Sequence, residues 1–456
     1  MRTSSPRATR AVASLAVAIG LAAACLGAPP ASAAPDPVKR AVPDYDGRPD
    51  APPTAGDVLL WVPRVVLSPA YFVSEYLLRR PLGFLITEAE RADLPHFLIT
   101  FFTFGGTDAG IVPTFLFDFG LGAGALPSAG FYFFWDDAIA AGHDIRLRFA
   151  SGGDDWWQLD FTNRYALSDR SRLSLAFDYD RRKDHIFAGI GGEFDDDHLG
   201  RYGEDRVAGT LGWTLDLGER GALDVGVEAA HFSYFRAACC DDPSLETRLE
   251  QGYYDEPPGL HHAHGTIGPQ IRLAVDTRAI RPGDESGVRA ELWGNLYAGI
   301  GDDDATWLRY GAAVGGYVDM YNNRTLGLRL HTELESTISG TIPFSELVFL
   351  GGSEPLRGFS SDRLRGDSAI ALTLDYRWPI WVFLDGTLFV EVGSVFGEHL
   401  EDFDTDALRL SFGMGIRPTS REDHPFELLV AAGSEPFGDG AHITSVRVVF
   451  GTTSGF

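Results

Sequence analysis

The chain has 456 residues, of which 45% are hydrophobic and 22% charged, and its 3 cysteines are too few for a disulfide-stabilised scaffold. Asp and Glu number 64 against 38 Lys and Arg, and this formal net charge of -26 argues against nucleic acid as a partner because phosphate binding needs clustered positive charge. Beyond the N-terminal region no apolar run reaches the roughly 18 residues of a membrane-spanning helix, which excludes a helical membrane protein.

The N-terminus has the composition of a secretory signal peptide. The basic MRTSSPRATR is followed by the apolar AVASLAVAIGLAAACLGA and the small-residue PPASA. We therefore predict a signal peptide over residues 1–33, with cleavage after Ala33, and an exported mature chain. Lipidation of Cys25 is the alternative, which is disfavoured because Ala22 rather than Leu stands three positions before it.

Two segments of different character follow the predicted signal peptide. Residues 34–56 are rich in Pro, Ala and charge without periodicity, which predicts a disordered linker. Residues 57–109 carry an apolar helical pattern interrupted by prolines, which predicts short amphipathic helices. These helices are expected to dock on a membrane surface or inside a barrel, or else to form a small packed cap.

From residue 110 onward the hydrophobic period changes to two, as expected of half-buried strands. One example is the segment 172–180, where polar residues and Ala176 separate the side chains of Leu173, Leu175, Phe177 and Tyr179. About sixteen such segments are present. They lie near residues 110–119, 128–136, 143–151, 155–166, 170–181, 205–217, 221–235, 267–277, 286–299, 304–319, 324–337, 368–378, 384–396, 406–417, 425–434 and 441–456.

The connections between these segments alternate between tight polar turns and long loops, the long ones including 182–204, 236–266, 338–367 and 397–405. A soluble sandwich has fewer and shorter strands, whereas a transmembrane barrel has short periplasmic turns and longer external loops. We therefore predict an all-β fold, a transmembrane antiparallel β-barrel of about 16 strands over residues 110–456. The helical segment is then expected on the periplasmic side.

The long loop before the twelfth segment contains a specific motif, Gly351-Gly352-Ser353-Glu354-Pro355-Leu356-Arg357-Gly358-Phe359. The pattern G-G-x-x-x-[VL]-R-G-[FY] resembles the sixth-loop signature of the Omp85 superfamily, the surface antigen D15 or BamA/TamA-type barrels of the bacterial outer membrane. The run Phe389-Val390-Glu391-Val392-Gly393 is similar to the family's F-x-D-x-G. Phe450 and the terminal Phe456 resemble its outer-membrane sorting signal. The resemblance covers about residues 110–456 and is strongest from 345 onward.

In that family the loop folds back into the lumen and its arginine pairs with inward carboxylates. The resemblance assigns this role to Arg357, with Gly351, Gly352, Leu356, Gly358 and Phe359 as the loop motif. Strand parity places Asp375 and Glu391 inside the barrel, so both are candidate partners, with Gly393 beside them. A guanidinium has a rigid fork of donors that suits two carboxylates. An ordinary solvated loop arginine is the alternative.

The resemblance implies a barrel that assists insertion or translocation of proteins or lipids by opening the seam between its first and last strands. The expected partners are outer-membrane lipids and either nascent outer-membrane proteins or a separate periplasmic subunit. Residues 34–109 do not have the β-α-α-β-β order of the family's POTRA domains, which favours the alternative of a passive pore or structural envelope barrel. No Gly-x-Ser-x-Gly elbow is present, and neither enzymatic activity nor a cofactor is predicted.

The remaining clusters are weaker signals. Cys239 and Cys240 are predicted to lie in an external loop, as a vicinal disulfide or as two unpaired or intermolecular thiols. His261, His262 and His264 adjoin an acidic stretch and have the chemistry of Zn²⁺ ligands, but a solvated loop is favoured and no metal site is predicted.

Overall fold

The computed structural model describes residues 76, 80–105, 108–121, 124–191, 198–278, 286–301, 305–320, 323–353, 355–381, 384–418 and 426–452. The predicted signal peptide, the predicted linker, Cys25 and Phe456 lie outside these residues, as does most of 57–79. Within the described part of the chain, no helix has the length and apolar character needed to cross a membrane.

Two helices precede the first long strand, in the segment predicted to be helical. Helix α5 spans Arg80–Arg91 and α6 spans Leu94–Phe102, and Asp93 between them adopts the left-handed conformation with φ 54°. After α6 the chain extends into the two-residue strand β1 (Thr103–Phe104), which the sequence did not predict. β1 pairs with the start of the first long strand, β2 (Ala109–Leu121), through Thr103 with Gly110 and Phe104 with Ala109.

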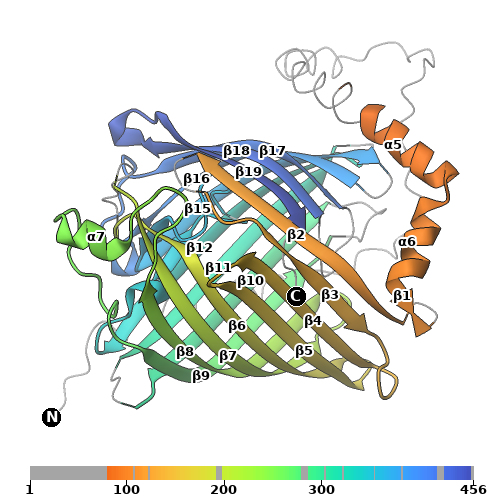
Figure 1. The fold of residues 1–456 in the computed structure, drawn as a ribbon, viewed down its shortest axis with the longest axis horizontal. Helices are drawn as coiled ribbons and strands as arrows, with labels where there is room; N and C mark the ends of the chain where they lie inside the picture. Colours follow the sequence, from red (N-terminus) through yellow and green to blue (C-terminus); the bar gives the residue numbers. More distant parts are fainter. Residues whose placement is uncertain are drawn as a thin grey trace.

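The strands form one antiparallel sheet that closes on itself (Figure 1). Among the described residues the sheet has 17 strands, and setting aside the short β1 leaves sixteen barrel strands, which confirms the predicted fold class. They are β2, β3 (Ser128–Trp135), β4 (His143–Gly153), β5 (Trp156–Ser168), β6 (Ser171–Phe187), β7 (Gly200–Asp216), β8 (Gly221–Arg236), β9 (His264–Asp276), β10 (Gly287–Gly299), β11 (Thr306–Asp319), β12 (Thr325–Ser339), β15 (Ser368–Trp381), β16 (Leu384–Phe396), β17 (Arg409–Pro418), β18 (Phe426–Pro436) and β19 (Ile443–Thr452).

The two faces of the strands follow the sequence alternation. On β6 the side chains of Leu173, Leu175 and Phe177 point outward and are 40%, 53% and 40% exposed. On the inner face, Arg148 of β4 and Asp160 of β5 form an ion pair at 3.4 Å. An apolar outer surface around a charged interior is the reverse of a soluble protein and is typical of an outer-membrane barrel.

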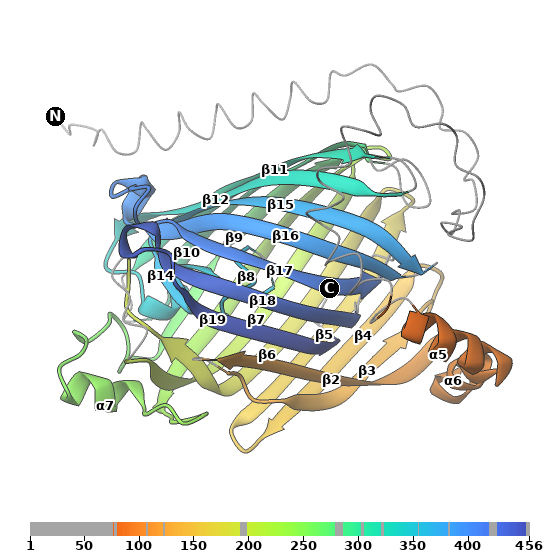
Figure 2. The same cartoon turned by 90° about the horizontal axis from the view of Figure 1, so that it is seen from above.

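The long loops gather at one end of the barrel, where α7 (Leu245–Glu250) lies, and α5 and α6 lie at the other end (Figure 2). Helix α7 begins after Ser244, whose hydroxyl accepts a hydrogen bond from the Thr247 backbone N–H as an N-cap. The long loop predicted at 182–204 is shorter in the structure, because only residues 188–199 separate β6 from β7. β6 continues to Phe187 and β7 begins at Gly200 because these ends pack against the interior, where Phe187 and Tyr202 form a buried cluster with Phe344.

The chain between β12 and β15, residues 340–367, is here called the lumen loop. It contains a 3-10 turn (Phe344–Glu346) and a small hairpin of β13 (Val348–Leu350) and β14 (Leu364–Gly366). Two further 3-10 turns follow at Glu398–Leu400 and Phe437–Asp439. A cluster of fully buried apolar side chains holds the lumen loop against β15 and β16. Its members are Val348, Leu350, Leu356, Phe359, Leu364, Ala369 and Val395.

Candidate functional site

The motif of the lumen loop forms a compact turn. Gly351 and Gly352 have φ values of 114° and 85°, a region that favours glycine because it lacks Cβ. The Gly352 backbone N–H donates to the Phe359 carbonyl at 2.9 Å, and the Phe359 N–H donates to the Leu356 carbonyl at 3.0 Å. Leu356 is the exception, a non-glycine residue with φ 65°, and its fully buried side chain fixes that strained conformation.

The tip of this turn places Arg357 between two inward carboxylates. Its Nε lies 3.0 Å from Glu391 Oε1 on β16, and its Nη2 lies 2.9 Å from Asp375 Oδ1 on β15. Arg357 and Glu391 are 0% exposed and Asp375 is 5% exposed. The structure therefore brings together the three side chains that parity and the loop motif single out. Because all three are desolvated, their hydrogen bonds are stronger than those of a surface pair.

Further contacts surround this ion triad. Glu391 Oε2 accepts from the Arg357 backbone N–H at 2.7 Å and from the Ser411 hydroxyl at 2.9 Å. The Arg357 guanidinium carbon lies 3.6 Å from the centre of the Phe389 ring, a cation–π contact. Glu391 is thus saturated by charged and neutral donors, which compensates for its burial.

Two glycines let the loop approach the barrel wall. A Cβ added to Gly358 would lie 2.2 Å from the Ala432 carbonyl of β18, and one added to Gly433 would lie 2.6 Å from the Phe359 ring. The Gly358 carbonyl accepts from the Ser445 hydroxyl of β19 at 2.7 Å. Gly393, expected beside the carboxylates, serves a different contact, because a Cβ there would lie 2.5 Å from the Ile370 carbonyl of the neighbouring β15.

The barrel closes through the pairing of β19 with β2, here called the seam. On its inner side, Arg447 of β19 donates from Nε to Asp118 Oδ1 of β2 at 2.7 Å and from Nη2 to Oδ2 at 2.6 Å. The same guanidinium donates through Nη1 to the carbonyls of Gly352 and Arg357. The seam pair and the loop motif therefore share one side chain. The pair was not predicted, although Asp118 and Arg447 both lie at inward positions of their strands, which is the sequence signal that could have identified them.

On the outer side of the seam, Phe450 of β19 packs against two rings of β2. Its centroid lies 5.4 Å from that of Phe115 and 6.5 Å from that of Phe117. Phe450 is 41% exposed on the apolar face. Its role in a sorting signal stays a prediction, as does that of Phe456, which lies outside the described residues.

The lumen loop also contacts the opposite wall, formed by β6, β7 and β8. His185 Nδ1 of β6 lies 2.8 Å from Asp362 Oδ2, and Arg365 Nη2 donates to the Tyr202 hydroxyl of β7 at 2.9 Å. Burial opposes ionisation of Asp362, but the hydrogen bond with His185 and nearby positive charges outweigh it and lower the pKa of Asp362 to about 2. These contacts were not predicted, since no local pattern links residues so distant in sequence.

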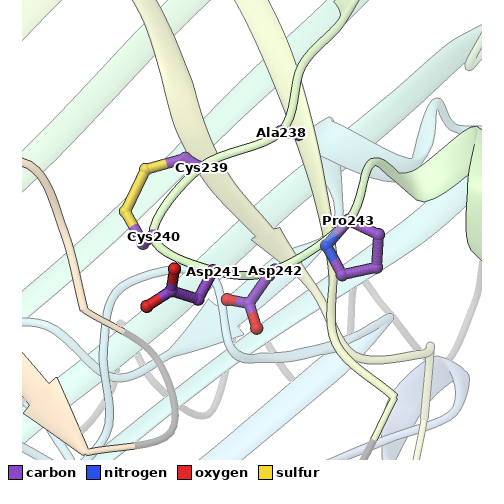
Figure 3. Close-up of a pocket in the computed structure, with 6 residues that line it drawn as sticks. All are labelled: Ala238, Cys239, Cys240, Asp241, Asp242 and Pro243. Atoms are coloured by element: carbon purple, nitrogen blue, oxygen red, sulfur yellow. A yellow bond between two sulfur atoms is a disulfide. The ribbon is translucent and has the colours of Figure 1, made fainter.

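The weaker clusters lie in the loop between β8 and β9, except for His264, which is the first residue of β9. Cys239 and Cys240 are joined by a vicinal disulfide at the edge of a shallow depression lined by residues 238–243 (Figure 3). Asp242 in this turn pairs with Arg201, which is 0% exposed, at 2.8 Å. The three histidines do not converge. His264 stacks on Phe232 at a centroid distance of 4.7 Å, and within the described residues no group of three or more metal-ligating side chains forms a site.

Comparison with known proteins gives one family match. The model of the Omp85 superfamily domain matches residues 141–432. No curated protein matches the sequence.

Solved structures show the same fold. BamA from Haemophilus ducreyi lacking POTRA domains 1-3 aligns with a TM-score of 0.52 and 16% identity over 76% of this chain and 70% of that chain. CdiB from Acinetobacter baumannii aligns with a TM-score of 0.50 and 10% identity over 75% of this chain and 60% of that chain. At these identities the likeness concerns the fold, and this chain matches less than two thirds of the length of CdiB.

Proposed function

Since this outer-membrane barrel belongs to the Omp85 superfamily, whose domain model spans more than half of its residues, we propose that it assists insertion or translocation of proteins or lipids through its seam. The proposed clients are nascent outer-membrane proteins, and outer-membrane lipids surround the seam. We propose that a separate periplasmic subunit delivers the clients to the barrel. The described residues before the barrel form α5, α6 and β1 instead of a β-α-α-β-β domain. The proposal assigns no catalytic chemistry to the chain.

The observation that carries this proposal is the shortness of the seam. Among the described residues, β19 and β2 are in register only from Val446–Gly451 and Leu121–Leu116, six residue pairs, whereas β6 and β7 pair along fifteen. Each backbone hydrogen bond contributes about 0.5–1.5 kcal/mol net. Among the described residues the seam has the fewest register pairs of any barrel pairing, one fewer than β3 with β4 and β17 with β18, so opening it breaks the fewest backbone hydrogen bonds. A freed β2 edge is a template on which an incoming strand can pair.

The sequence of β2 agrees with a weak seam. Pro113 has no backbone N–H and is tolerated mainly at sheet edges. It lies three residues before Leu116, where the described pairing with β19 ends. The part of β2 around Pro113 is therefore suited to exchange partners.

The lumen loop argues against a passive pore. It is fastened to β15 and β16 through Arg357 and to β6 and β7 through Asp362 and Arg365, so it crosses the lumen. The loop therefore narrows the lumen as long as these buried contacts are made. In planar lipid bilayers the purified protein is expected to show little steady conductance, and a large stable conductance would favour the pore alternative.

Photo-crosslinking at the seam tests the proposed function. A benzoylphenylalanine replaces Phe450, on the outer face of the seam, and in a control protein it replaces Phe177 on β6, which is 40% exposed against 41% for Phe450. Irradiation of growing cells should give adducts with nascent outer-membrane proteins at the first position and not at the second. Equal adducts at both positions, or none at Phe450, would contradict the proposal.

A further inference from the structure

Helix α6 has an unusually apolar exposed surface. Its sequence LPHFLITFF has no Asp, Glu, Lys or Arg. Leu94, Phe97, Leu98 and Phe101 follow the i, i+3, i+4, i+7 spacing of one helical face and are 41%, 58%, 40% and 68% exposed. Fully burying one such side chain is worth about 1.5–3 kcal/mol, so this face is strongly unfavourable in water.

The C-terminal end of α6 is fixed to the rim of the barrel. Strand β1 pairs with β2, and the Phe104 ring stacks against Phe133 of β3 with centroids 6.5 Å apart. Phe133 shares the outer face of β3 with Trp135, which is 42% exposed. Gly110 permits the close approach, since a Cβ there would lie 2.7 Å from the Phe102 carbonyl. The apolar surface of this segment is therefore continuous with the outer face of the barrel.

The other helix reaches the barrel on the opposite side of the seam. A Cβ added to Gly83 of α5 would lie 3.2 Å from the ring of Trp381, at the end of β15. In the strand order, β16 to β19 lie between β15 and β2. The helix pair thus contacts strands on both sides of the seam, and it lies beyond the strand ends, at the end of the barrel opposite α7 (Figures 1 and 2).

We propose that α6 and Phe104 insert into the periplasmic leaflet of the outer membrane beside the seam, where phospholipid acyl chains cover the exposed face. The helix of 9 residues is only about 13.5 Å long at 1.5 Å per residue, so it lies along the leaflet instead of crossing it. The charged residues are in α5 and the turn, where Glu88, Glu90 and Arg91 are exposed to water. This arrangement has one lipid-embedded helix beside the charged C-terminal end of α5, which remains in water.

The consequence is local to the seam. Strand β2 is the strand whose edge must be freed, and α6 is joined to it through β1. A movement of α6 in the lipid is therefore transmitted to β2. The helix also displaces phospholipid from the place where a client strand enters the membrane. The inference rests on the orientation of the barrel in the outer membrane and is independent of the client's identity.

Fluorescence quenching tests the placement. The full mature chain carries Phe97→Cys or, as a control on α5, Glu90→Cys, both in a Cys239→Ser/Cys240→Ser background, and is labelled with the fluorophore NBD. The labelled proteins are reconstituted in phosphatidylethanolamine and phosphatidylglycerol vesicles with acyl-chain-brominated lipid. The label at position 97 should lose fluorescence to the brominated lipid and resist aqueous iodide, and the label at position 90 should do the reverse.

Two outcomes would overturn the inference. Quenching of the position 97 label by iodide would show that the face is in water. Resistance to both quenchers would show that protein, such as a second copy of the chain, covers it. Neither outcome bears on capture of clients at Phe450, so failure here is distinct from failure of the proposed function.

Proteolysis gives a second test that needs no label. The Phe97→Ser/Phe101→Ser variant in vesicles should be cut by trypsin at Arg91 faster than the parent, because the helix pair no longer docks. Ile139→Ser, a change at an 83% exposed apolar residue in the turn after β3, should leave cleavage at Arg91 unchanged. A gel shift on heating verifies that each barrel is folded. An unchanged rate in the double variant would also overturn the inference.

Discussion

Arg447 on the last barrel strand and Asp118 on the first are joined across the seam by two parallel hydrogen bonds of 2.7 and 2.6 Å. Arg447 also donates to the carbonyl of Arg357 at 3.2 Å in the lumen loop. Displacing the loop therefore removes a partner of the residue that holds the seam. Opening of the seam and movement of the loop are expected to be coupled.

Removing the seam carboxylate should destabilise the barrel. Asp118→Ala leaves Arg447, whose side chain is 6% exposed, without its counter-charge, a change that typically costs about 3–5 kcal/mol in a buried pair. The measurement is the midpoint of denaturant unfolding in detergent, followed by the gel shift. Asp216→Ala is the matched control, because its partner Arg172 is 50% exposed and such pairs contribute about 0–1 kcal/mol. An equal decrease of the unfolding midpoint in the two variants would show that the seam pair contributes no more stability than an exposed ion pair.

Arg357→Ala should release the lumen loop. Glu391 and Asp375 would then face each other in a desolvated lumen, and breaking such a buried pair costs about 3–5 kcal/mol. Protease added outside cells should cut near Phe359 in the variant and not in the parent, and the folded yield should fall. Arg357→Lys should be milder because it keeps the charge while losing the fork. A protease-resistant, fully folded Arg357→Ala protein would mean that this pairing does not anchor the loop.

The contact of the loop with β18 depends on the absence of one side chain. Gly358→Ala would place a methyl group 2.2 Å from the Ala432 carbonyl, so the loop or the strand must move. An overpacked site typically costs about 1–3 kcal/mol, measured as a lower unfolding midpoint and faster proteolysis of the loop. Gly316→Ala on β11 is the control, since nothing lies within 4 Å of its added Cβ. A loop equally protected in both variants would contradict the close packing.

Docking of the loop on the opposite wall should depend on pH. The pKa of Asp362 is lowered to about 2, below its value of about 3.9 in an unfolded chain, so the ionised carboxylate stabilises the docked loop above that unfolded value. This stabilisation is lost as pH falls from about 4 towards 2. Hydrogen exchange of residues 340–367 should rise over that range in the parent and vary less in Asp362→Asn. Identical profiles in the two proteins would refute the contribution of Asp362.

The sequence was most informative where a short-range rule applies. Period-two alternation places Asp375 and Glu391 on the inner face, and the loop motif identifies Arg357, because side-chain direction in a strand follows from position alone. Contacts that depend on tertiary packing could not be predicted. The pairing of His185 with Asp362 joins residues 177 positions apart, and no local pattern encodes it.

The same contrast explains the missed elements. β1 has only two residues and forms because the end of α6 delivers Phe104 to the edge of β2, which is a tertiary event. The outer ends of β6 and β7 were predicted as loop because their polar residues break the alternation. They are strands because the lumen loop packs against them through Phe344.

A disulfide across the seam tests the central claim most directly. Phe119 and Val448 are register partners on β2 and β19, and Leu175 and Leu211 are register partners on β6 and β7. Each pair is replaced by cysteines in a Cys239→Ser/Cys240→Ser background, and the protein is reconstituted in phospholipid vesicles. Folding of a urea-denatured small outer-membrane barrel into these vesicles is then followed by its gel shift. The activity is faster folding of this client barrel than in vesicles without the protein. Oxidation should abolish the activity of the protein with the Phe119–Val448 pair, reduction should restore it, and the protein with the Leu175–Leu211 pair should stay active when oxidised. Full activity with the seam crosslinked would contradict the account.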